Sequence, residues 1–594
     1  MMLYMIPVHI YMFQSVLINN GMQCKTMRNV LGFAAILFVS CMASTQEMNS
    51  FENPDFGILE VYSNGACNTE VPMCSRLGVK VLMQGGNAVD SAVASAICVG
   101  IVNSFSSGIG GGGFMLIKKP GEEGAVDMID FREVAPKRLS TKVLYEARNG
   151  PKVGGLSVGV PSEVHGIYEA HMKYGKLPWK NLFQENIQIA KGFPASSQLV
   201  KRINKFKEFI AIDPGLRSTY MRNNELLKEG DVVVRENYAK TLEMIMNNPD
   251  DFYNGSLADS IVKAVNNQGG VLAKSDLQEY KSIHRPVVEG RYHDYKVYTT
   301  NLPTSGPLVL KALNILEKYN LNSLVADDIQ TGKFRNLHLL IEIFKFMMAR
   351  RGELADPEFL ENWKDMVNEI TSKEIAEQIY KKIDLDKVLD AKEYGMKKHG
   401  VEDHGTTHMN VVDKDDMAVL LTSSINFEFG AKFMDPETGI VFNNTMDDFQ
   451  APEHNDANAG SANALDAGKR PFSSMSPVIL SKSDELLVLG AAGGIRIPTS
   501  IVSTLFHLST GKNLKEAIMT TRMHNHLFPD VTFVEHDIAG PVEQYLVDSG
   551  HVIEKSLENT VFTSVQGILL KRSNGNRTIH AVSDLRKGGE SFGY

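Results

Sequence analysis

The sequence has few cysteines and tryptophans, no low-complexity tract and no long basic run. Five cysteines in 594 residues are too few for a scaffold built on disulfides. A formal net charge of -9 argues against nucleic acid as a partner. No P-loop motif occurs. The 43% hydrophobic content supports a substantial core, and the length exceeds one ordinary domain.

The N-terminal segment differs from the rest of the chain. Residues 27–44 combine a basic start, an apolar run and small residues near the end. The run is shorter than the ~20 residues that span a bilayer, which is typical of a secretory signal peptide. The apolar residues 1–23 could lengthen it into an anchor. We therefore expect residues 1–43 to be a leader that directs the chain to the secretory pathway, with secretion favoured over anchoring.

Removal of the leader leaves three cysteines, which allow at most one internal pair. They are Cys67, Cys74 and Cys98, and we expect Cys74 to pair with Cys98. Three N-x-S/T sequons, at Asn254, Asn443 and Asn576, fit a secretory route.

A glycine-rich stretch, residues 107–113, formally contains G-x-G-x-x-G. A dinucleotide loop follows a strand and opens a helix. Here a small-residue helix at 87–102 precedes the glycines and a strand at 114–118 follows them, so we interpret them as a tight turn. A hairpin of this strand with 125–131 would place Arg132 at a strand end, where guanidinium can bind a carboxylate in a two-pronged way.

The remaining pattern divides near residue 405. Residues 151–400 are predicted to be mainly helical, with an apolar helix at 337–351 and a charged helical region at 361–398. Beyond it we expect strands and then helices. The predicted strands are 408–412, 418–424, 439–442, 478–480, 486–489, 563–571 and 578–581. The predicted helices are 499–508, 514–521 and 542–549.

The junction itself reads Asp403-His-Gly-Thr-Thr-His-Met-Asn-Val-Val412. A threonine hydroxyl is a poor nucleophile unless a base lies beside it, and cleavage before Thr406 would supply the new α-amine as that base. Such an amine has a pKa of about 7.7–8. Gly405 tolerates the strained backbone that an N→O acyl shift requires. His404 and His408 could suggest a metal pair, but they lie in a loop and a strand without H-E-x-x-H.

Four further motifs add specificity. They are Asp130-Phe-Arg-Glu133, Asn443-Asn-Thr-Met-Asp-Asp-Phe449, Lys469-Arg-Pro-Phe-Ser-Ser-Met-Ser-Pro477 and Gly490-Ala-Ala-Gly-Gly-Ile-Arg496. Together with the junction, the sequence from about Gly57 to Tyr594 resembles the γ-glutamyltransferase family of N-terminal-nucleophile hydrolases. The resemblance implies an α+β fold, an αββα four-layer sandwich built from both processed chains. It implies a large subunit of residues 44–405 and a small catalytic subunit of 406–594, which form a heterodimer, and no cofactor or metal. Family members are secreted or type II membrane-anchored.

The resemblance also implies a reaction. The precursor cleaves itself between Gly405 and Thr406. Thr406 then attacks the γ-amide of glutathione or a related γ-glutamyl donor. Water, or an amino acid or dipeptide acceptor, resolves the γ-glutamyl ester.

Residue by residue, the resemblance implies an oxyanion hole at Gly493 and Gly494, whose backbone N–H groups approach closely. Ser424 stands where the family often has a second threonine bonded to the nucleophile. The donor's α-carboxylate and α-ammonium need opposed clamps. The carboxylate contacts would be Arg132, Ser473 and Ser474, and the ammonium contacts Asp448 and Asn426.

Two departures from the family pattern stand out. Thr445 occupies the position of a Gln or Glu that faces the ammonium, which predicts weaker donor binding. The expected lid between Gln450 and Lys469 has no tyrosine, and lid closure governs water exclusion. Asn443 lies in the substrate motif, so we do not expect it to carry sugar.

Two alternatives remain at this point. A related acylase for glutaryl or β-lactam side-chain amides would share Thr406 and the two glycines, but it would need no ammonium clamp, so Asp448 and Asn426 argue against it. An uncleaved, inactive surface binding protein is supported only by Thr445.

Overall fold

Two seven-stranded antiparallel sheets form the middle of the fold in a computed structural model, which describes residues 60–121, 125–147, 150–396, 405–451, 461–556 and 563–594. The expected leader, His404 and most of the expected lid lie outside these residues. The first sheet has the order β1-β20-β19-β15-β14-β11-β10. Its strands are Val61–Tyr62, Asn576–Ser583, Ser564–Ser573, Glu485–Ala492, Val478–Ser481, Tyr295–Thr299 and Val288–Tyr292.

The second sheet has the order β21-β2-β12-β13-β3-β4-β9. Its strands are Glu590–Gly593, Ala66–Thr69, Thr407–Val412, Ala418–Ser424, Gly112–Lys118, Val126–Phe131 and Ile283–Arg285. Both sheets contain strands from before and after Gly405, and all described residues belong to one compact unit. A cut at Gly405 would therefore leave two pieces that share both sheets.

The two sheets pack face to face, and alternation along their strands separates the cores. Phe114, Leu116, Leu420, Val488 and Ile568 belong to the cluster between the sheets. The intervening residues of the second sheet, among them Met115 and Leu421, belong to a different cluster shared with helices. This period of two is the pattern of a strand buried on both faces.

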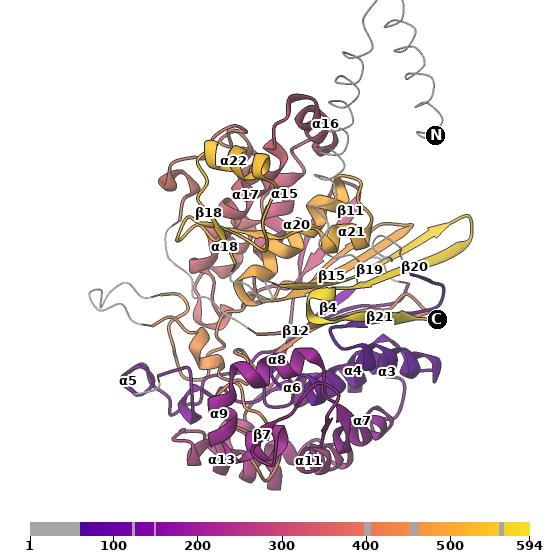
Figure 1. Ribbon diagram of the computed structural model, residues 1–594, viewed down its shortest axis with the longest axis vertical. Helices are drawn as coiled ribbons and strands as arrows, with labels where there is room; N and C mark the ends of the chain where they lie inside the picture. The colour runs from indigo at the N-terminus through magenta and orange to yellow at the C-terminus, as the bar shows by residue number, and fades with distance from the viewer. Residues whose placement is uncertain (1–59, 122–124, 148–149, 397–404, 452–460, 557–562) are drawn as a thin grey trace, which may run out of the picture. The chain divides into compact units, whose positions relative to one another are not determined.

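Helices cover the outer face of each sheet (Figure 1). Those packed with the second sheet come from residues 72–278. They are α3 Pro72–Met83, α4 Ala88–Val102, α6 Glu163–Tyr174, α7 Asn181–Lys191, α8 Ser197–Lys205, α9 Lys207–Ile212, α10 Pro214–Tyr220, α11 Glu236–Asn247, α12 Asp251–Asn254, α13 Ser256–Asn267 and α14 Lys274–Gln278. The short α5 spans Thr141–Glu146.

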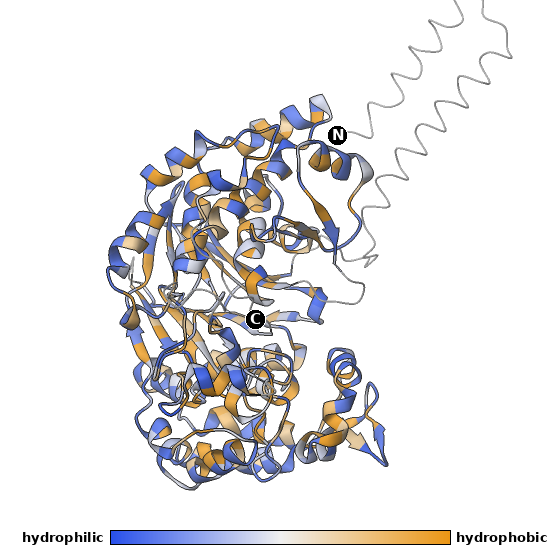
Figure 2. Ribbon diagram, turned by 90° about the vertical axis from the view of Figure 1, so that its left-hand side faces the viewer, coloured by the Kyte–Doolittle hydropathy of each residue, from blue (hydrophilic) through white to orange (hydrophobic). Residues whose placement is uncertain are grey.

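The helices on the first sheet come from both sides of the junction. They are α15 Gly306–Leu316, α16 Leu321–Thr331, α17 Arg335–Met348, α18 Trp363–Ile370, α19 Lys373–Tyr380, α20 Ile497–Ser509, α21 Leu514–Met519 and α22 Gly540–Asp548. Many helices carry hydrophilic and hydrophobic residues on one ribbon, as expected for helices with one buried face (Figure 2). The order helix, sheet, sheet, helix confirms the predicted αββα sandwich.

Short strands complete the fold. A three-stranded sheet contains β16 Met523–His524, β17 Thr532–Val534 and β18 Ile553–Lys555. Two small pairs join β5 Phe193–Pro194 with β8 Val232–Val233, and β6 Met221–Arg222 with β7 Glu225–Leu226. No helix among the described residues is long and apolar enough to cross a membrane.

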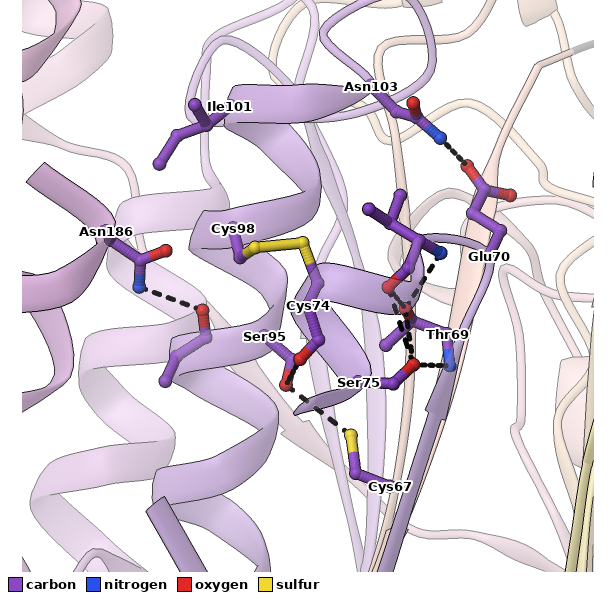
Figure 3. Close-up of a disulfide and its surroundings, with 12 residues drawn as sticks. Cys67, Thr69, Glu70, Cys74, Ser75, Ser95, Cys98, Ile101, Asn103 and Asn186 are labelled. Carbon is purple, nitrogen blue, oxygen red and sulfur yellow. Dashed lines mark hydrogen bonds between the residues drawn. A yellow bond between two sulfur atoms is a disulfide. The ribbon is translucent and has the colours of Figure 1, made fainter. Parts of the chain in front are cut away.

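The disulfide between Cys74 and Cys98 confirms the predicted pairing. It joins α3 to α4, and every residue of α4 is buried. Cys67 lies beside this pair with its Sγ 3.5 Å from Ser95 Oγ (Figure 3). The pairing ties two helices of the layer that covers the second sheet.

Several predicted elements were wrong. Strands β9, β10 and β11 lie within the region expected to be mainly helical. Residues 439–442 form only an isolated bridge, Met434 with Val441, and not a strand. The charged region at 361–398 contains two short helices, and η5 at Ala391–Tyr394 is a 3-10 turn. The sequence around β9–β11 was predicted to be mainly helical. Sheet pairing with distant segments decided the structure of these three strands instead.

Candidate active site

The backbone at the junction turns sharply at Gly405. Its φ is +66°, and a Cβ at this position would lie 1.8 Å from the carbonyl oxygen of Asn426. Only glycine fits both conditions. Thr406 follows immediately before β12, its side chain is buried, and its hydroxyl donates to the Gly405 carbonyl. The predicted nucleophile thus contacts the carbonyl of the bond that we expect to be cut.

Ser424 ends β13 beside this junction. Its hydroxyl donates to the Gly405 carbonyl at 2.9 Å, and it accepts the backbone N–H of Asn426 at 2.7 Å. Asn426 itself has φ +69°, and its side-chain amide donates to the Asn444 carbonyl at 3.1 Å. Ser424 and Asn426 therefore lie beside the junction at Gly405.

Arg132 directly follows β4, at the expected strand end. Its guanidinium forms an ion pair with Asp448 and lies 3.5 Å from Glu133. Thr445 donates its hydroxyl to Glu133 at 2.8 Å. Asp448 and Thr445 both belong to the 3-10 turn η6, Thr445–Asp448. The sequence placed Arg132 and Asp448 at opposite ends of one ligand, whereas here they contact each other.

The two predicted serines lie in the segment that follows Arg470. Arg132 donates Nε to the Pro471 carbonyl at 3.3 Å, which brings this segment against the guanidinium. Ser473 Oγ accepts the N–H of Met475 at 3.2 Å, and Ser474 Oγ accepts from Arg351 at 3.0 Å. Both serines are buried. The contact of Arg351 with Ser474 was not predicted, because the two residues lie 123 positions apart.

Gly493 and Gly494 lie at the end of β15, between the strand and α20. Their φ angles are +140° and +62°, values that favour glycine at both positions. Ser564 pairs with Ala492, and Val565 donates to Asp584 at 2.9 Å. Asp584 in turn caps η8, Leu585–Lys587, whose last residue contacts Thr406. The strand that ends at the two glycines is thus paired with β19, which contacts the residue that caps the turn of Lys587.

Lys587 also contacts the junction and is paired with Glu70, and the sequence predicted a role for neither residue. Lys587 Nζ donates to the Thr406 carbonyl at 2.8 Å and pairs with Glu70 Oε2 at 3.1 Å. Lys587 lies 181 residues from Thr406 in an ordinary polar turn sequence, which carries no local signal.

Buried carboxyl groups lie behind Arg132. Burial raises the pKa of Glu133, and the Arg132 charge partly offsets this rise. Burial also raises the pKa of Glu163 to about 7, opposed by a hydrogen bond from Ser423 and reinforced by the Glu133 charge. A negative charge is therefore costly in this region unless a cation accompanies it.

His408 lies between the two sheets and uses both ring nitrogens. Nδ1 is 2.8 Å from Thr422 Oγ1, and Nε2 is 2.9 Å from Asn410 Oδ1. A Cβ on Gly490 would lie 2.1 Å from the ring, so glycine leaves the space that His408 fills. Burial lowers the pKa of His408 to about 4, which makes it a neutral internal hydrogen-bonding group.

One cluster of metal-ligand type occurs among the described residues, at His338, Glu342 and His551. Both ring nitrogens of His338 form hydrogen bonds. Nδ1 lies 2.8 Å from His551 Nε2, and Nε2 lies 2.9 Å from the Asp384 carbonyl oxygen. Glu342 accepts the Tyr394 hydroxyl at 2.7 Å, and the Lys345 ammonium lies 3.4 Å away. These contacts form a hydrogen-bonded network, and the nearby ammonium opposes a second cation.

A family model and several known proteins match most of this chain, and they indicate the same family. Residues 74–594 match the family described as Gamma-glutamyltranspeptidase. The chain is 37% identical to glutathione hydrolase proenzyme 2 of Schizosaccharomyces pombe, over 89% of this chain and 87% of that protein. It is 35% identical to the glutathione hydrolase proenzyme of Escherichia coli, over 86% and 90% of the two chains.

Two solved structures extend the comparison to the fold. The cephalosporin acylase of Bacillus halodurans superposes with a TM-score of 0.78 at 24% identity, over 92% of this chain and 98% of that one. This likeness concerns the fold alone. The γ-glutamyltranspeptidase of Helicobacter pylori gives a TM-score of 0.51 at 29% identity, over 55% of this chain and 93% of that one.

Proposed function

The chain belongs to the gamma-glutamyltranspeptidase family, and we propose that it is a glutathione hydrolase and γ-glutamyltransferase that cleaves itself before Thr406. The observation that carries this proposal is the contact of the Thr406 hydroxyl with the Gly405 carbonyl, at a position that only glycine can occupy. Residues 44–405 and 406–594 would be the two subunits, held together by the shared sheets.

Self-cleavage begins with Thr406 Oγ attacking the Gly405 carbonyl carbon. The hydroxyl proton passes to the departing amide nitrogen, the C–N bond breaks, and an ester joins Gly405 to Thr406. The Ser424 hydroxyl, 2.9 Å from the carbonyl oxygen, can stabilise the negative charge that develops there. The acyl shift has already freed the α-amine of Thr406. Water then hydrolyses the ester, which releases the Thr406 hydroxyl and the carboxylate of Gly405.

In turnover, that α-amine takes the Thr406 hydroxyl proton while Oγ attacks the γ-amide of glutathione. The tetrahedral intermediate carries an oxyanion, for which the N–H groups of Gly493 and Gly494 are the proposed donors. The amine returns the proton to departing cysteinylglycine. Water, an amino acid or a dipeptide then attacks the γ-glutamyl ester, which gives hydrolysis or transfer.

Donor recognition uses the ion pair of Arg132 with Asp448. A zwitterionic donor carries both a carboxylate and an ammonium. When it binds, Arg132 can exchange its contact with Asp448 for the donor carboxylate, and Asp448 can then bind the donor ammonium. Ser473 and Ser474 add hydroxyl donors for the carboxylate, and Asn426 adds an amide oxygen for the ammonium. Thr445, bonded to Glu133, is the proposed replacement for a longer polar side chain on the ammonium side.

A cell-surface or secreted location is the proposed destination. The Cys74–Cys98 disulfide supports it, because such bonds persist in oxidising compartments. Two of the three sequons, Asn254 and Asn576, are exposed, which supports it further. Residues 1–43 remain the proposed leader, as a signal peptide or a type II anchor.

The first test is the N-terminal sequence and intact mass of the purified protein. We expect a second N-terminus that begins Thr-Thr-His-Met-Asn. Thr406→Ala should give one uncut chain without activity, and Thr407→Ala is the matched control that should still be cut. A cut Thr406→Ala protein would falsify the nucleophile assignment, and an uncut wild-type chain would favour an inactive binding protein.

The second test separates this function from that of an acylase. A γ-glutamyl anilide and the glutaryl anilide differ only in the α-amino group that Asp448 and Asn426 would hold. We expect kcat/KM to be at least about 100-fold higher for the γ-glutamyl compound, because the glutaryl analogue leaves buried polar groups unpaired. Equal or reversed preference would support the acylase.

A further inference from the structure

The carbonyl of Thr406 is held by a lysine from the far end of the chain. Lys587 Nζ lies 2.8 Å from this oxygen, and its side chain is only 11% exposed. Thr406 precedes the first residue of β12, so its carbonyl lies outside the strand pairing of Thr407 with Ser423. The lysine therefore holds the residue that carries both the nucleophile and the prospective base.

Glu70 fixes the other side of this lysine. Its Oε2 pairs with Lys587 at 3.1 Å, and the carboxylate is completely buried. Its Oε1 accepts from Asn103 and Ser106, each at 3.2 Å, and Figure 3 shows the Asn103 contact beside the disulfide. The backbone carbonyl of Ser106 also accepts the N–H of Ile425, the residue after Ser424, at 3.1 Å. Glu70 is thus part of the same rigid surroundings as the junction.

The turn that carries Lys587 is equally fixed. Asp584 caps it by accepting the N–H of Arg586 at 3.0 Å, and it also forms an ion pair with Arg522 at 2.6 Å. Gly588 follows with φ +72° and ends the turn. A long lysine side chain loses less freedom on binding when its backbone and its carboxylate partner are already held.

We propose that Lys587 and Glu70 are positioning residues that orient Thr406 and set the basicity of its α-amine. This inference rests on the proposed function of Thr406. The ammonium of Lys587 contacts the carbonyl of Thr406, the residue that carries the α-amine. Its positive charge disfavours protonation of that amine, and the neutral amine is the form that acts as base. Glu70 limits this effect, so the two side chains act on the amine in opposite directions.

The two side chains should shift the pKa of the α-amine in opposite directions. A purely structural role of these residues would not produce such shifts, so they test the proposal. Lys587→Met removes the positive charge, so the α-amine pKa should rise and the acid limb of the kcat/KM profile should move to higher pH. Glu70→Gln leaves the lysine charge unbalanced, so that limb should move to lower pH. We expect each shift to be about 0.5–1 pH unit.

The positioning effect should appear in kcat. Lys587→Met should lower kcat about 10–100-fold with little change in KM, because the donor contacts are elsewhere. Lys587→Arg should recover most of kcat, since guanidinium can reach the same two oxygens. Lys333→Met is the matched control, because it removes an exposed ion pair with Asp386, which the proposal does not involve.

All variants are measured as full-length precursor, with the rate of self-cleavage followed by intact mass and the pH profile taken on the processed fraction. If Lys587→Met is not processed, rescue of cleavage by Lys587→Arg serves as the readout. Shifts of both acid limbs in one direction, or kcat and cleavage rates equal to wild type, would overturn the proposal. These outcomes can be distinguished from failure of the proposed function, because in that case the wild-type protein itself would be uncut or inactive.

Discussion

Arg132 and Asp448 form an ion pair in which the side chains are only 2% and 3% exposed. The two residues are 316 positions apart in the chain. From the sequence, we predicted that they bind opposite ends of one γ-glutamyl donor. A buried pair is costly to break by removing one member, because the remaining buried charge loses its oppositely charged partner in the pair.

Single substitutions at this pair should therefore affect both stability and binding. We expect Arg132→Ala to be processed but to have a KM at least about 30-fold higher. Its free energy of unfolding should fall by about 3–5 kcal/mol. The measurements are donor kinetics and denaturant unfolding of the processed enzyme.

The double variant Arg132→Met/Asp448→Leu separates the two effects. Removing both charges should restore part of the stability, because Glu133 still loses the Arg132 charge, while donor binding stays lost. Recovery of donor affinity in the double variant would contradict the clamp assignment.

His408 predicts a pH dependence of stability. Burial lowers its pKa from 6.5 to about 4, so the unfolded chain binds a proton between these values and the folded one does not. The stabilisation is therefore complete above pH 6.5 and is lost as the pH falls through about 4. The contribution is about 3 kcal/mol.

Unfolding by denaturant at pH 7 and pH 4.5 measures this effect. His408→Gln should show a smaller loss of stability on acidification than the wild type. His507→Gln, at another buried histidine with a lowered pKa, tests whether the loss is specific to the layer between the sheets. An equal acid loss in wild type and His408→Gln would rule out this histidine as its source.

The three sequons should differ in occupancy. Asn254 and Asn576 are exposed, whereas Asn443 is fully buried. The Asn443 amide donates to the carbonyls of Gly110 and Gly159 at 2.8 and 2.9 Å, which leaves no room for sugar. Expression through a secretory route should give glycosidase-sensitive forms.

Asn→Gln substitution identifies the sites by mobility. Asn254→Gln and Asn576→Gln should each remove one glycan, and Asn443→Gln should remove none. The last variant should instead lose about 1–3 kcal/mol of stability, because buried partners become unsatisfied. Sugar found at Asn443 would show that the motif around it is not folded as described.

The disulfide and Cys67 predict a thiol count. Burial raises the pKa of Cys67 to about 11, so little thiolate exists at pH 8. In protein without the leader, we expect no fast-reacting thiol when folded, one after denaturation, and three after reduction. Cys74→Ala/Cys98→Ala should lower the free energy of unfolding by about 2–4 kcal/mol. Rapid labelling of the folded protein would contradict the burial of Cys67.

Local patterns were sufficient for elements whose own residues carry the period. The predicted strand 418–424 coincides with β13, and the helix at 87–102 is α4 with Asn87 as its cap. The glycine turn before β3 was also predicted correctly, because its order of helix, turn and strand excludes a dinucleotide loop. The region 283–299 was misread, since β9–β11 are short and take their structure from distant partners.

The sequence by itself determined the chemistry that depends on residue type in a local order: a glycine before a threonine, a guanidinium after a strand, and paired glycines before a helix. The tertiary structure alone decided that Arg132 contacts Asp448, and that Lys587 contacts both Thr406 and Glu70. Contacts between residues hundreds of positions apart leave no local pattern. They arise only when sheet pairing and burial bring charged groups together and force each to find a partner.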